Sequence, residues 1–146
     1  ADNYAQVTWF GKGPHENYCD RNTGAPVGIY NLKIEDMVHP YVRPQENGQR
    51  TGTFWVNLSG NEKEVRIEAQ NEPLEFSVWP YNDADLEAAQ HPHEQSFYLV
   101  TTLHIDRKQK GVGGDYPGIL NLKEPYKISK YTEQECGFRL KIYPID

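Results

Sequence analysis

The chain has 146 residues, 37% of them hydrophobic and 25% charged, which suits one globular domain with its own core. A net charge of -6 without a basic cluster excludes the usual composition of proteins that bind nucleic acid or anionic membranes. No apolar run approaches the roughly 20 residues of a membrane-spanning helix, so we expect no membrane segment. The N-terminus shows no initiator methionine and no signal peptide, which favours a processed or truncated chain.

Apolar and polar residues alternate along much of the chain, which is the period of a β-strand. We expect strands at 6–10, 28–33, 51–58, 65–69, 74–79, 97–104, 126–129 and 138–142, with turn-forming residues between them. The alternation is cleanest at 65–69 and 138–142, which predicts strands with one face open to water.

One short helix is expected at residues 85–89, capped by Asn82 or Asp83 and ended by His91-Pro92. Many short strands with one short helix predict an all-β fold, an antiparallel β-sandwich, as a single domain over residues 1–146. Cys19 and Cys136 are expected to be free thiols, because a lone pair of cysteines does not form a disulfide framework or a zinc site.

Several short motifs carry reactive side chains, but none specifies a reaction. His91 and His93 could face one metal ion from a strand, yet a third ligand is missing nearby, so their role stays open and we predict no metal site. The glycines of 111–115 are not followed by the Lys-Ser/Thr pair of a phosphate loop, which favours a loop with close backbone approach. Neighbouring polar pairs at 15–16 and 46–47 could supply acid and base groups, but one sequence does not show which carboxylates face each other. We therefore assign no catalytic residue.

Four blocks of residues resemble a known family. They are WFGKGPHENYCDR at 9–21, PYVRPQENGQR at 40–50, Phe76-Ser77 with Tyr81, Asp85-Leu86, Ala89 and His91, and Asp106 with QKGVGGD at 109–115. In this order and over nearly the whole chain, they look like the C-terminal domain of family-two glycoside hydrolases, the large bacterial β-galactosidases.

This resemblance implies a galactose-mutarotase-like supersandwich, of which the chain would be only the later part. The catalytic TIM barrel, with its two glutamates and retaining mechanism, would lie outside the chain, and the chain alone would be inactive. The magnesium and sodium ions that the family uses would also be bound elsewhere, so no cofactor is expected here. The expected partners are the barrel and the β-galactoside, in a soluble bacterial protein of cytoplasm or periplasm. A sheet face left bare would be apolar and would favour a homo-oligomer.

The resemblance also places one loop of this domain at the sugar. After the GGD sequence the family carries a tryptophan that forms an aromatic wall, whereas here Tyr116 follows Gly114 and Asp115. These three residues are the expected substrate contacts. Either the tyrosine ring stacks on the sugar in place of the tryptophan, or the site admits something larger than lactose.

The polar residues of the first two blocks are expected to be structural, since side chains in irregular turns satisfy backbone groups that would otherwise be unpaired. These residues are His15, Glu16, Asn17, Arg43, Glu46 and Asn47.

Two other functions compete with this interpretation. A stand-alone carbohydrate-binding module would expose Trp9, Trp55, Trp79 and Tyr116 as a sugar platform, although strand tryptophans are more often buried. A mutarotase-like enzyme would use a histidine with a carboxylate, either at 15–16 or at 104 and 106.

Overall fold

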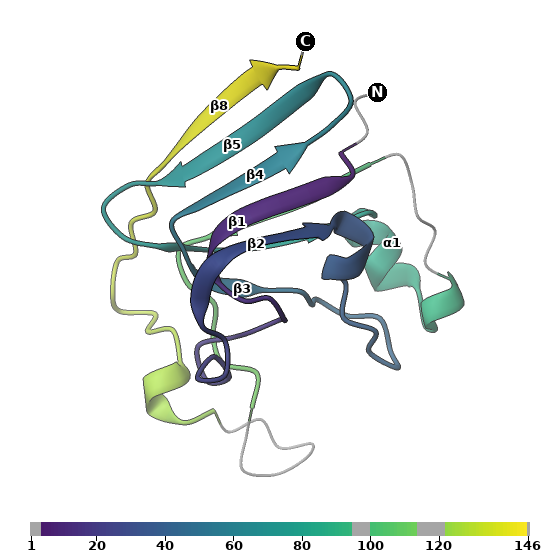
Figure 1. The fold of residues 1–146 in the computed structure, drawn as a ribbon. Helices are drawn as coiled ribbons and strands as arrows, with labels where there is room; N and C mark the ends of the chain where they lie inside the picture. Colours follow the sequence, from purple (N-terminus) through teal and green to yellow (C-terminus); the bar gives the residue numbers. More distant parts are fainter. Residues whose placement is uncertain (1–3, 95–99, 114–121, 146) are drawn as a thin grey trace.

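A computed structural model describes residues 4–94, 100–113 and 122–145, in which eight strands form two antiparallel sheets (Figure 1). The larger sheet has the order β2-β1-β4-β5-β8, with bounds Val27–Lys33, Gln6–Lys12, Trp55–Ser59, Lys63–Ala69 and Phe138–Pro144. The smaller sheet has the order β3-β6-β7, with bounds Arg50–Thr53, Leu74–Trp79 and Thr102–Asp106. The predicted antiparallel β-sandwich with one short helix is confirmed.

That helix, α1, spans Asp83–Ala88, so it begins two residues before the expected range, and its cap is Asn82, one of the two predicted caps. The Asn82 side chain accepts a hydrogen bond from the Asp85 backbone N–H at 2.8 Å, which satisfies a donor that the first turn leaves free. Three 3-10 turns complete the regular structure of the described residues: η1 at Ile34–Met37, η2 at Pro92–Glu94 and η3 at Glu124–Tyr126. No helix of the described residues is long and apolar enough to cross a membrane.

The expected strand at 51–58 is in fact two strands, because the chain changes sheets within it. β3 pairs with β6 in the small sheet, whereas β4 pairs with β1 and β5 in the large sheet. Phe54 lies between them, and Gly52 just before it has a φ of 60°. The buried positions shift by one residue at the crossing, from Thr53 in β3 to Val56 in β4. The apolar pattern of the sequence does not show this shift, because the buried residues of β3 are polar.

Two other expectations need correction. The strand predicted at 126–129 does not exist; Glu124–Tyr126 forms the turn η3, with a proline at its start. The strand predicted at 97–104 is observed as Thr102–Asp106, and positions 97–99 lie outside the described residues.

The core fills the space between the two sheets. Its buried residues come from both sheets and from η1; they are Val7, Trp9, Ile34, Met37, Val56, Leu58, Ile67, Leu74, Phe76 and Val78. Trp9 and Phe76 meet edge to face across the sandwich, with ring centroids 5.8 Å apart. The small sheet therefore covers the centre of the large one.

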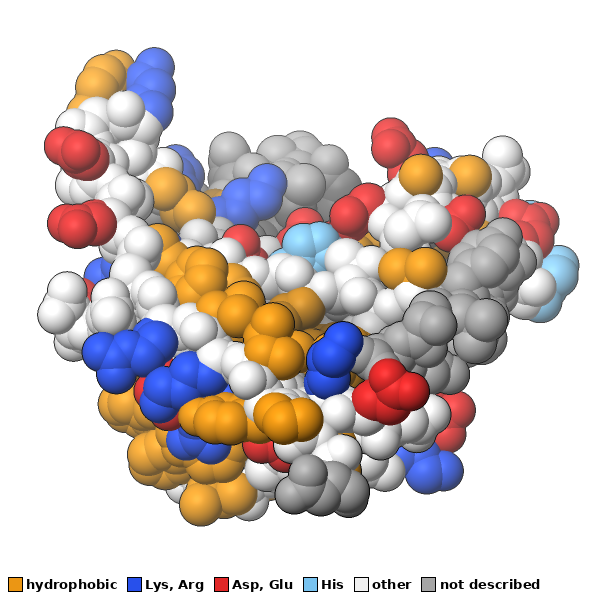
Figure 2. All heavy atoms as spheres, turned by 90° about the horizontal axis from the view of Figure 1, so that it is seen from above, with side chains coloured by type: hydrophobic (Ala, Val, Ile, Leu, Met, Phe, Trp, Pro, Cys, Tyr) orange, Lys and Arg blue, Asp and Glu red, His pale blue; other side chains and the backbone are white. Residues whose placement is uncertain are grey.

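The small sheet does not cover β8, the last strand of the large sheet. One row of directly opposed residues crosses the large sheet from Trp9 through Val56 and Ile67 to Leu140. Opposed residues share a face of the sheet, yet the exposed fraction changes from 0%, 2% and 3% to 52% along this row. Phe138 and Ile142, on the same face of β8, are exposed as well. Figure 2, which looks down on this side of the molecule, shows a band of hydrophobic side chains open to solvent.

Candidate functional site

The first two family blocks meet at the buried carboxylate of Glu16. Its Oε1 accepts hydrogen bonds from the Tyr41 hydroxyl at 2.7 Å and from the Arg21 guanidinium at 2.5 Å. Its Oε2 accepts one from the Gly48 backbone N–H at 2.6 Å and a longer one from Tyr18 at 3.4 Å. Four donors thus converge on one side chain, and they come from residues up to 32 positions away. Charge-assisted hydrogen bonds of this kind are among the strong ones in proteins.

These contacts decide the charge of Glu16. Burial by itself would raise the pKa of the carboxyl. The hydrogen bonds from Gly48 and Tyr41, together with the electrostatic influence of His39 and Arg21, outweigh burial, so the pKa of Glu16 lies below its ordinary value. Glu16 is therefore an anion held in place by its neighbours, and burial beside that anion raises the pKa of Tyr41.

Asn17, the next residue, is fully buried and joins its block to β3. Its Oδ1 accepts from both the backbone N–H and the hydroxyl of Thr51, at 3.0 Å and 2.6 Å, and its Nδ2 donates to the His15 carbonyl. Asn47 has the same kind of role in the second block, since its Oδ1 accepts from the His39 N–H and its Nδ2 donates to the Gln45 carbonyl.

Arg50 is a buried cation under the same two blocks. Its guanidinium donates to the carbonyls of Pro14 and Gly48, at 3.0 Å and 2.6 Å, and lies over the ring of Trp9. Burial lowers the pKa of Arg50 to about 10, opposed by the nearby charge of Glu16. Because the buried Arg50 guanidinium donates to a carbonyl of the first block and to one of the second, it links the two blocks.

The fourth block approaches this cluster from β7. The Gln109 backbone N–H donates to Glu75 at 2.8 Å, and its side chain donates to Asp106 and Glu46. Further along, the Gly113 N–H donates to Asp20 at 2.7 Å. Burial raises the pKa of Glu75, and the neighbouring Asp106 raises it further.

A cavity of about 390 Å³ opens where these blocks meet. Its walls carry two phenol rings, charges of both signs and the end of the fourth block; the lining residues are Tyr18, Asp20, Arg21, Tyr41, Gln45, Glu46, Val112 and Gly113. A mixture of aromatic and hydrogen-bonding groups is the usual lining of a small-molecule site.

The predicted residues are distributed unevenly over this site. Glu16, Asn17 and Asn47 are buried at its base, whereas His15, Arg43 and Glu46 are exposed. The predicted sugar contacts Gly114, Asp115 and Tyr116 lie outside the described residues.

Sequence reasoning missed several residues that build the cluster, above all Asp20, Arg21, Tyr41, Gly48 and Arg50. All five belong to the quoted blocks, so the signal was present. What the sequence did not reveal is that charged side chains of one block form hydrogen bonds with neutral groups of another block far away in the sequence.

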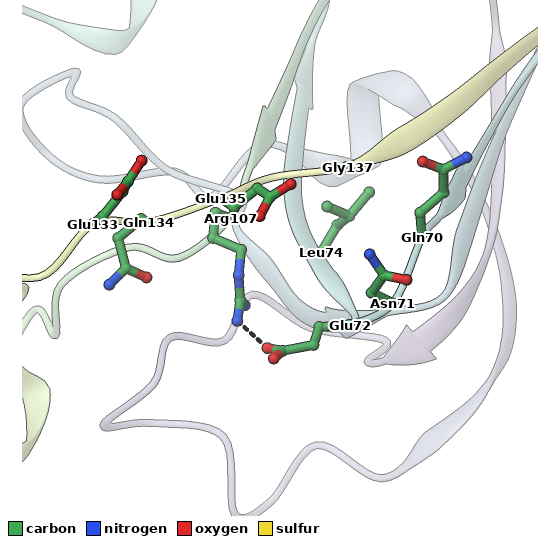
Figure 3. A pocket seen from close by; sticks show the side chains of 9 residues that line it. All are labelled: Gln70, Asn71, Glu72, Leu74, Arg107, Glu133, Gln134, Glu135 and Gly137. Carbon is green, nitrogen blue, oxygen red and sulfur yellow. Dashed lines mark hydrogen bonds and ion pairs between the residues drawn. The ribbon is translucent and has the colours of Figure 1, made fainter.

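A second cavity, of about 410 Å³, lies beside the β5–β6 turn (Figure 3). It is lined mainly by amides and carboxylates, and its Arg107 forms an ion pair with Glu72. Its lining residues take no part in the hydrogen bonds described above for Glu16, Arg50 and Gln109. We assign it no role.

The histidines do not assemble into a metal centre in the described part of the chain, where no group of three or more His, Cys, Asp and Glu side chains is placed to hold an ion. His91 stacks on His93 and contacts Glu94, all at the surface. His104 packs on the ring of Trp79, and its Nε2 lies 3.2 Å from the Oδ1 of Asp83.

The tryptophans proposed for a sugar platform are arranged differently from that hypothesis. Trp9 and Trp79 are buried, and their indole N–H groups donate to the backbone carbonyls of Lys12 and Asn47. Trp55 is partly exposed on the outer face of the large sheet, under the guanidinium of Arg66. The hypothesis of a sugar platform that exposes Trp9 and Trp79 is therefore wrong.

Comparison with known proteins places the chain in a family. Residues 1–140 match the family model described as beta galactosidase small chain. The chain is 41% identical to a beta-galactosidase of Halalkalibacterium halodurans over 136 residues, which is 92% of the chain and 13% of that protein. It is 35% identical to a beta-galactosidase of Lactococcus lactis over 141 residues, 96% of the chain and 14% of that protein. For a beta-galactosidase of Priestia megaterium the identity is 35% over 112 residues, 77% of the chain and 11% of that protein.

The chain thus spans 11% to 14% of the length of these three curated relatives. The family model covers nearly the whole chain. The chain belongs to the beta-galactosidase small-chain family.

Proposed function

We propose that this chain is the later part of the C-terminal domain of a bacterial β-galactosidase that hydrolyses terminal non-reducing β-D-galactosides. The observation that carries this proposal is the convergence of the family blocks: residues from 16 to 113 meet around one cavity through hydrogen bonds to the carboxylates of Glu16 and Asp20. In this proposal the domain supports the catalytic barrel and contributes one loop to the sugar site.

The catalytic pair of glutamates belongs, in this proposal, to the TIM barrel outside the chain. One glutamate would attack the anomeric carbon and the other would serve as acid and then as base. Glu16 is unsuited to either task here, because four donors already occupy its carboxylate. We therefore expect the isolated chain to be inactive, and we expect any magnesium or sodium of the complete enzyme to be bound by residues outside it.

The proposed sugar contact is tested by Tyr116→Ala in the complete enzyme. Loss of one ring contact costs about 1 kcal/mol, so we expect KM for a galactoside to rise about fivefold with a smaller change in kcat. The control is Tyr131→Ala, which removes a tyrosine that is 87% exposed and outside the four blocks. Steady-state kinetics with both constants unchanged in Tyr116→Ala would refute the contact.

The apolar face of β8 supports a proposal about association. Leu140 lies in the middle of that face and is 52% exposed. Exposed apolar sheet faces of this kind favour pairing, and we propose that the isolated chain covers this one with a second copy of itself.

Sedimentation velocity at high concentration tests this pairing, and a dimer is the expected result. Leu140→Glu places a charge on the face and should give a monomer, whereas Val42→Glu changes a side chain that is 90% exposed in a loop and should leave the dimer intact. A monomeric chain at all concentrations would contradict the proposal.

A further inference from the structure

Two carboxylates meet at one end of the small sheet, at the last pair of opposed residues on β6 and β7. Glu75 and Asp106 lie directly opposite each other in the register of these antiparallel strands. Glu75 is only 8% exposed, although an ionised carboxylate strongly prefers water. Like charges that lie directly opposite on neighbouring strands destabilise the pairing. This end of the sheet therefore holds two groups that repel each other when both are ionised.

The two carboxylates share their hydrogen-bond donors. The Gln49 Nε2 lies 3.3 Å from the Oε2 of Glu75 and 3.4 Å from the Oδ2 of Asp106. Gln109 also donates to both, with its backbone N–H to Glu75 at 2.8 Å and with its Nε2 to Asp106 at 3.1 Å. Because single residues contact both carboxylates, the two groups form one cluster.

The donors of this cluster are neutral amides. Among the described residues, no cationic side chain forms an ion pair with either carboxylate, and the Lys108 side chain, whose charge acts on Glu75, is exposed. Gln49 is 1% exposed, and its Oε1 is buried and accepts no hydrogen bond from any described group. The cluster thus has more acceptors than donors. A proton on one carboxylate would add a donor and remove the repulsion between the two.

The electrostatic surroundings of Glu75 agree with this geometry. Burial raises the pKa of Glu75 above its ordinary value of 4.5, and the charge of Asp106 raises it further. The hydrogen bonds from Gln109 and Gln49 act in the opposite direction but do not cancel the upward shift. Two interacting carboxylates titrate as a pair, so the proton belongs to both. The other titratable side chains around the pair come from separate segments of the chain; they are Cys19, Glu46, His104 and Lys108.

We propose that the Glu75–Asp106 pair is a pH-sensitive contact. With one proton shared between the carboxylates, the pair closes this end of β6 and β7 and holds Gln109; when the proton leaves, this end loosens. The segment after β7 leads to Val112 and Gly113 in the wall of the cavity. The pair thus makes the order of that wall depend on pH.

The direction of the pH dependence follows from the raised pKa of the folded chain. Such a carboxyl stabilises the fold fully below its ordinary pKa, and this contribution is lost as the pH rises through the folded pKa. Because one proton is involved, the equilibrium constant for opening should rise by at most about tenfold per pH unit in that interval. Glu16, whose pKa is lowered, gives the opposite sign, so the two carboxylates can be distinguished.

The experiment compares urea unfolding of the unchanged chain and of Glu75→Gln between about pH 4 and about pH 8. The glutamine keeps an acceptor oxygen and cannot ionise. We therefore expect its unfolding constant to be about fivefold smaller than that of the unchanged chain at the upper pH and about equal at the lower pH. Glu133→Gln makes the same chemical change at an exposed carboxylate, and its effect should not vary with pH.

Two further measurements locate the effect. Asp106→Asn removes the opposing charge and keeps an acceptor oxygen, so in this background Glu75→Gln should have a smaller effect at the upper pH. Hydrogen exchange of the Gln109 amide, corrected for its intrinsic rate, reports on the end of β7. Its protection should fall with rising pH in the unchanged chain and stay constant in Glu75→Gln.

Three results would overturn the inference. A difference between the unchanged chain and Glu75→Gln that is the same at every pH would show that the pair binds no proton in this range. A pH-dependent difference that persists in full in Asp106→Asn would show that Glu75 titrates without its opposed partner. Protection of the Gln109 amide that does not change with pH would show that the proton does not act on the end of β7.

Discussion

Glu16→Ala is expected to lower the free energy of unfolding of the chain by about 1–3 kcal/mol for each buried hydrogen-bond donor that it leaves unpaired. The substitution leaves the Gly48 N–H and the Tyr41 hydroxyl without their acceptor, and it leaves Arg21 without its counter-ion. Urea unfolding followed by tryptophan fluorescence measures the loss.

The control is Glu35→Ala, since Glu35 is an exposed carboxylate whose ion pair with Lys33 is open to solvent. That change should stay within about 0.5 kcal/mol, as surface substitutions usually do. Glu16→Gln should fall between the two, because the amide oxygen still accepts a hydrogen bond. A loss for Glu16→Ala no larger than that for Glu35→Ala would show that the cluster does not hold the two blocks together.

The same carboxylate predicts how stability depends on pH. The folded pKa of Glu16 lies below 4.5, its ordinary value, so its contribution is complete above that value. The contribution is lost as the pH falls through the lower folded pKa, where the carboxylate takes up a proton. In Glu16→Gln this part of the acid-induced loss should be missing, which urea unfolding between pH 3 and pH 7 would reveal as a flatter curve (roughly the range over which carboxyls titrate).

Gly48→Ala is expected to be the second large destabilisation, at about 1–3 kcal/mol for the backbone alone. Gly48 has a φ of 78°, a conformation that a side chain disfavours, and an added Cβ would lie 2.8 Å from the Met37 carbonyl oxygen. Because that oxygen is backbone, the clash adds to the conformational cost.

Substitutions at two other glycines distinguish the conformational cost from the steric clash in the same unfolding experiment. Gly52 also has a positive φ, of 60°, but its nearest neighbour would be the flexible Lys12 side chain at 3.6 Å. Gly24 has no atom within 4 Å of the added Cβ. The expected order of destabilisation is Gly48→Ala, then Gly52→Ala, then Gly24→Ala. Equal losses for Gly48→Ala and Gly24→Ala would contradict the close packing described at the second block.

The period of the sequence was enough to find most strands but not to show which sheet each one joins. Residues 65–69 and 138–142 alternate regularly, and both lie in strands that pair with each other. At Phe54 the chain leaves the small sheet for the large one, and the crossing could not be predicted because the buried residues of β3 are polar and give no apolar pattern. The strand predicted at 126–129 is the opposite error. The apolar residues there resemble a strand in sequence, but they have no partner strand, and Glu124–Tyr126 forms a turn.

The candidate site was only partly predictable for a related reason. The blocks identify Glu16 and Asn17 as unusual residues, but their partners Tyr41 and Thr51 are more than 20 positions away. Only the folded chain shows that Asp20 reaches Gly113 across 93 positions. Long-range hydrogen bonding of polar and charged side chains depends on the topology, and it leaves no periodic signal in the sequence.

The size of the native polypeptide in the source cell tests the central proposal most directly. An antibody raised against this chain would be used for immunoblotting of a cell extract, and the precipitated protein would be assayed for β-galactoside hydrolysis. We expect a polypeptide several times longer than 146 residues, with galactosidase activity in the precipitate. A polypeptide of this chain's own size, without hydrolytic activity in the precipitate, would contradict the proposal that the chain serves as part of a larger β-galactosidase.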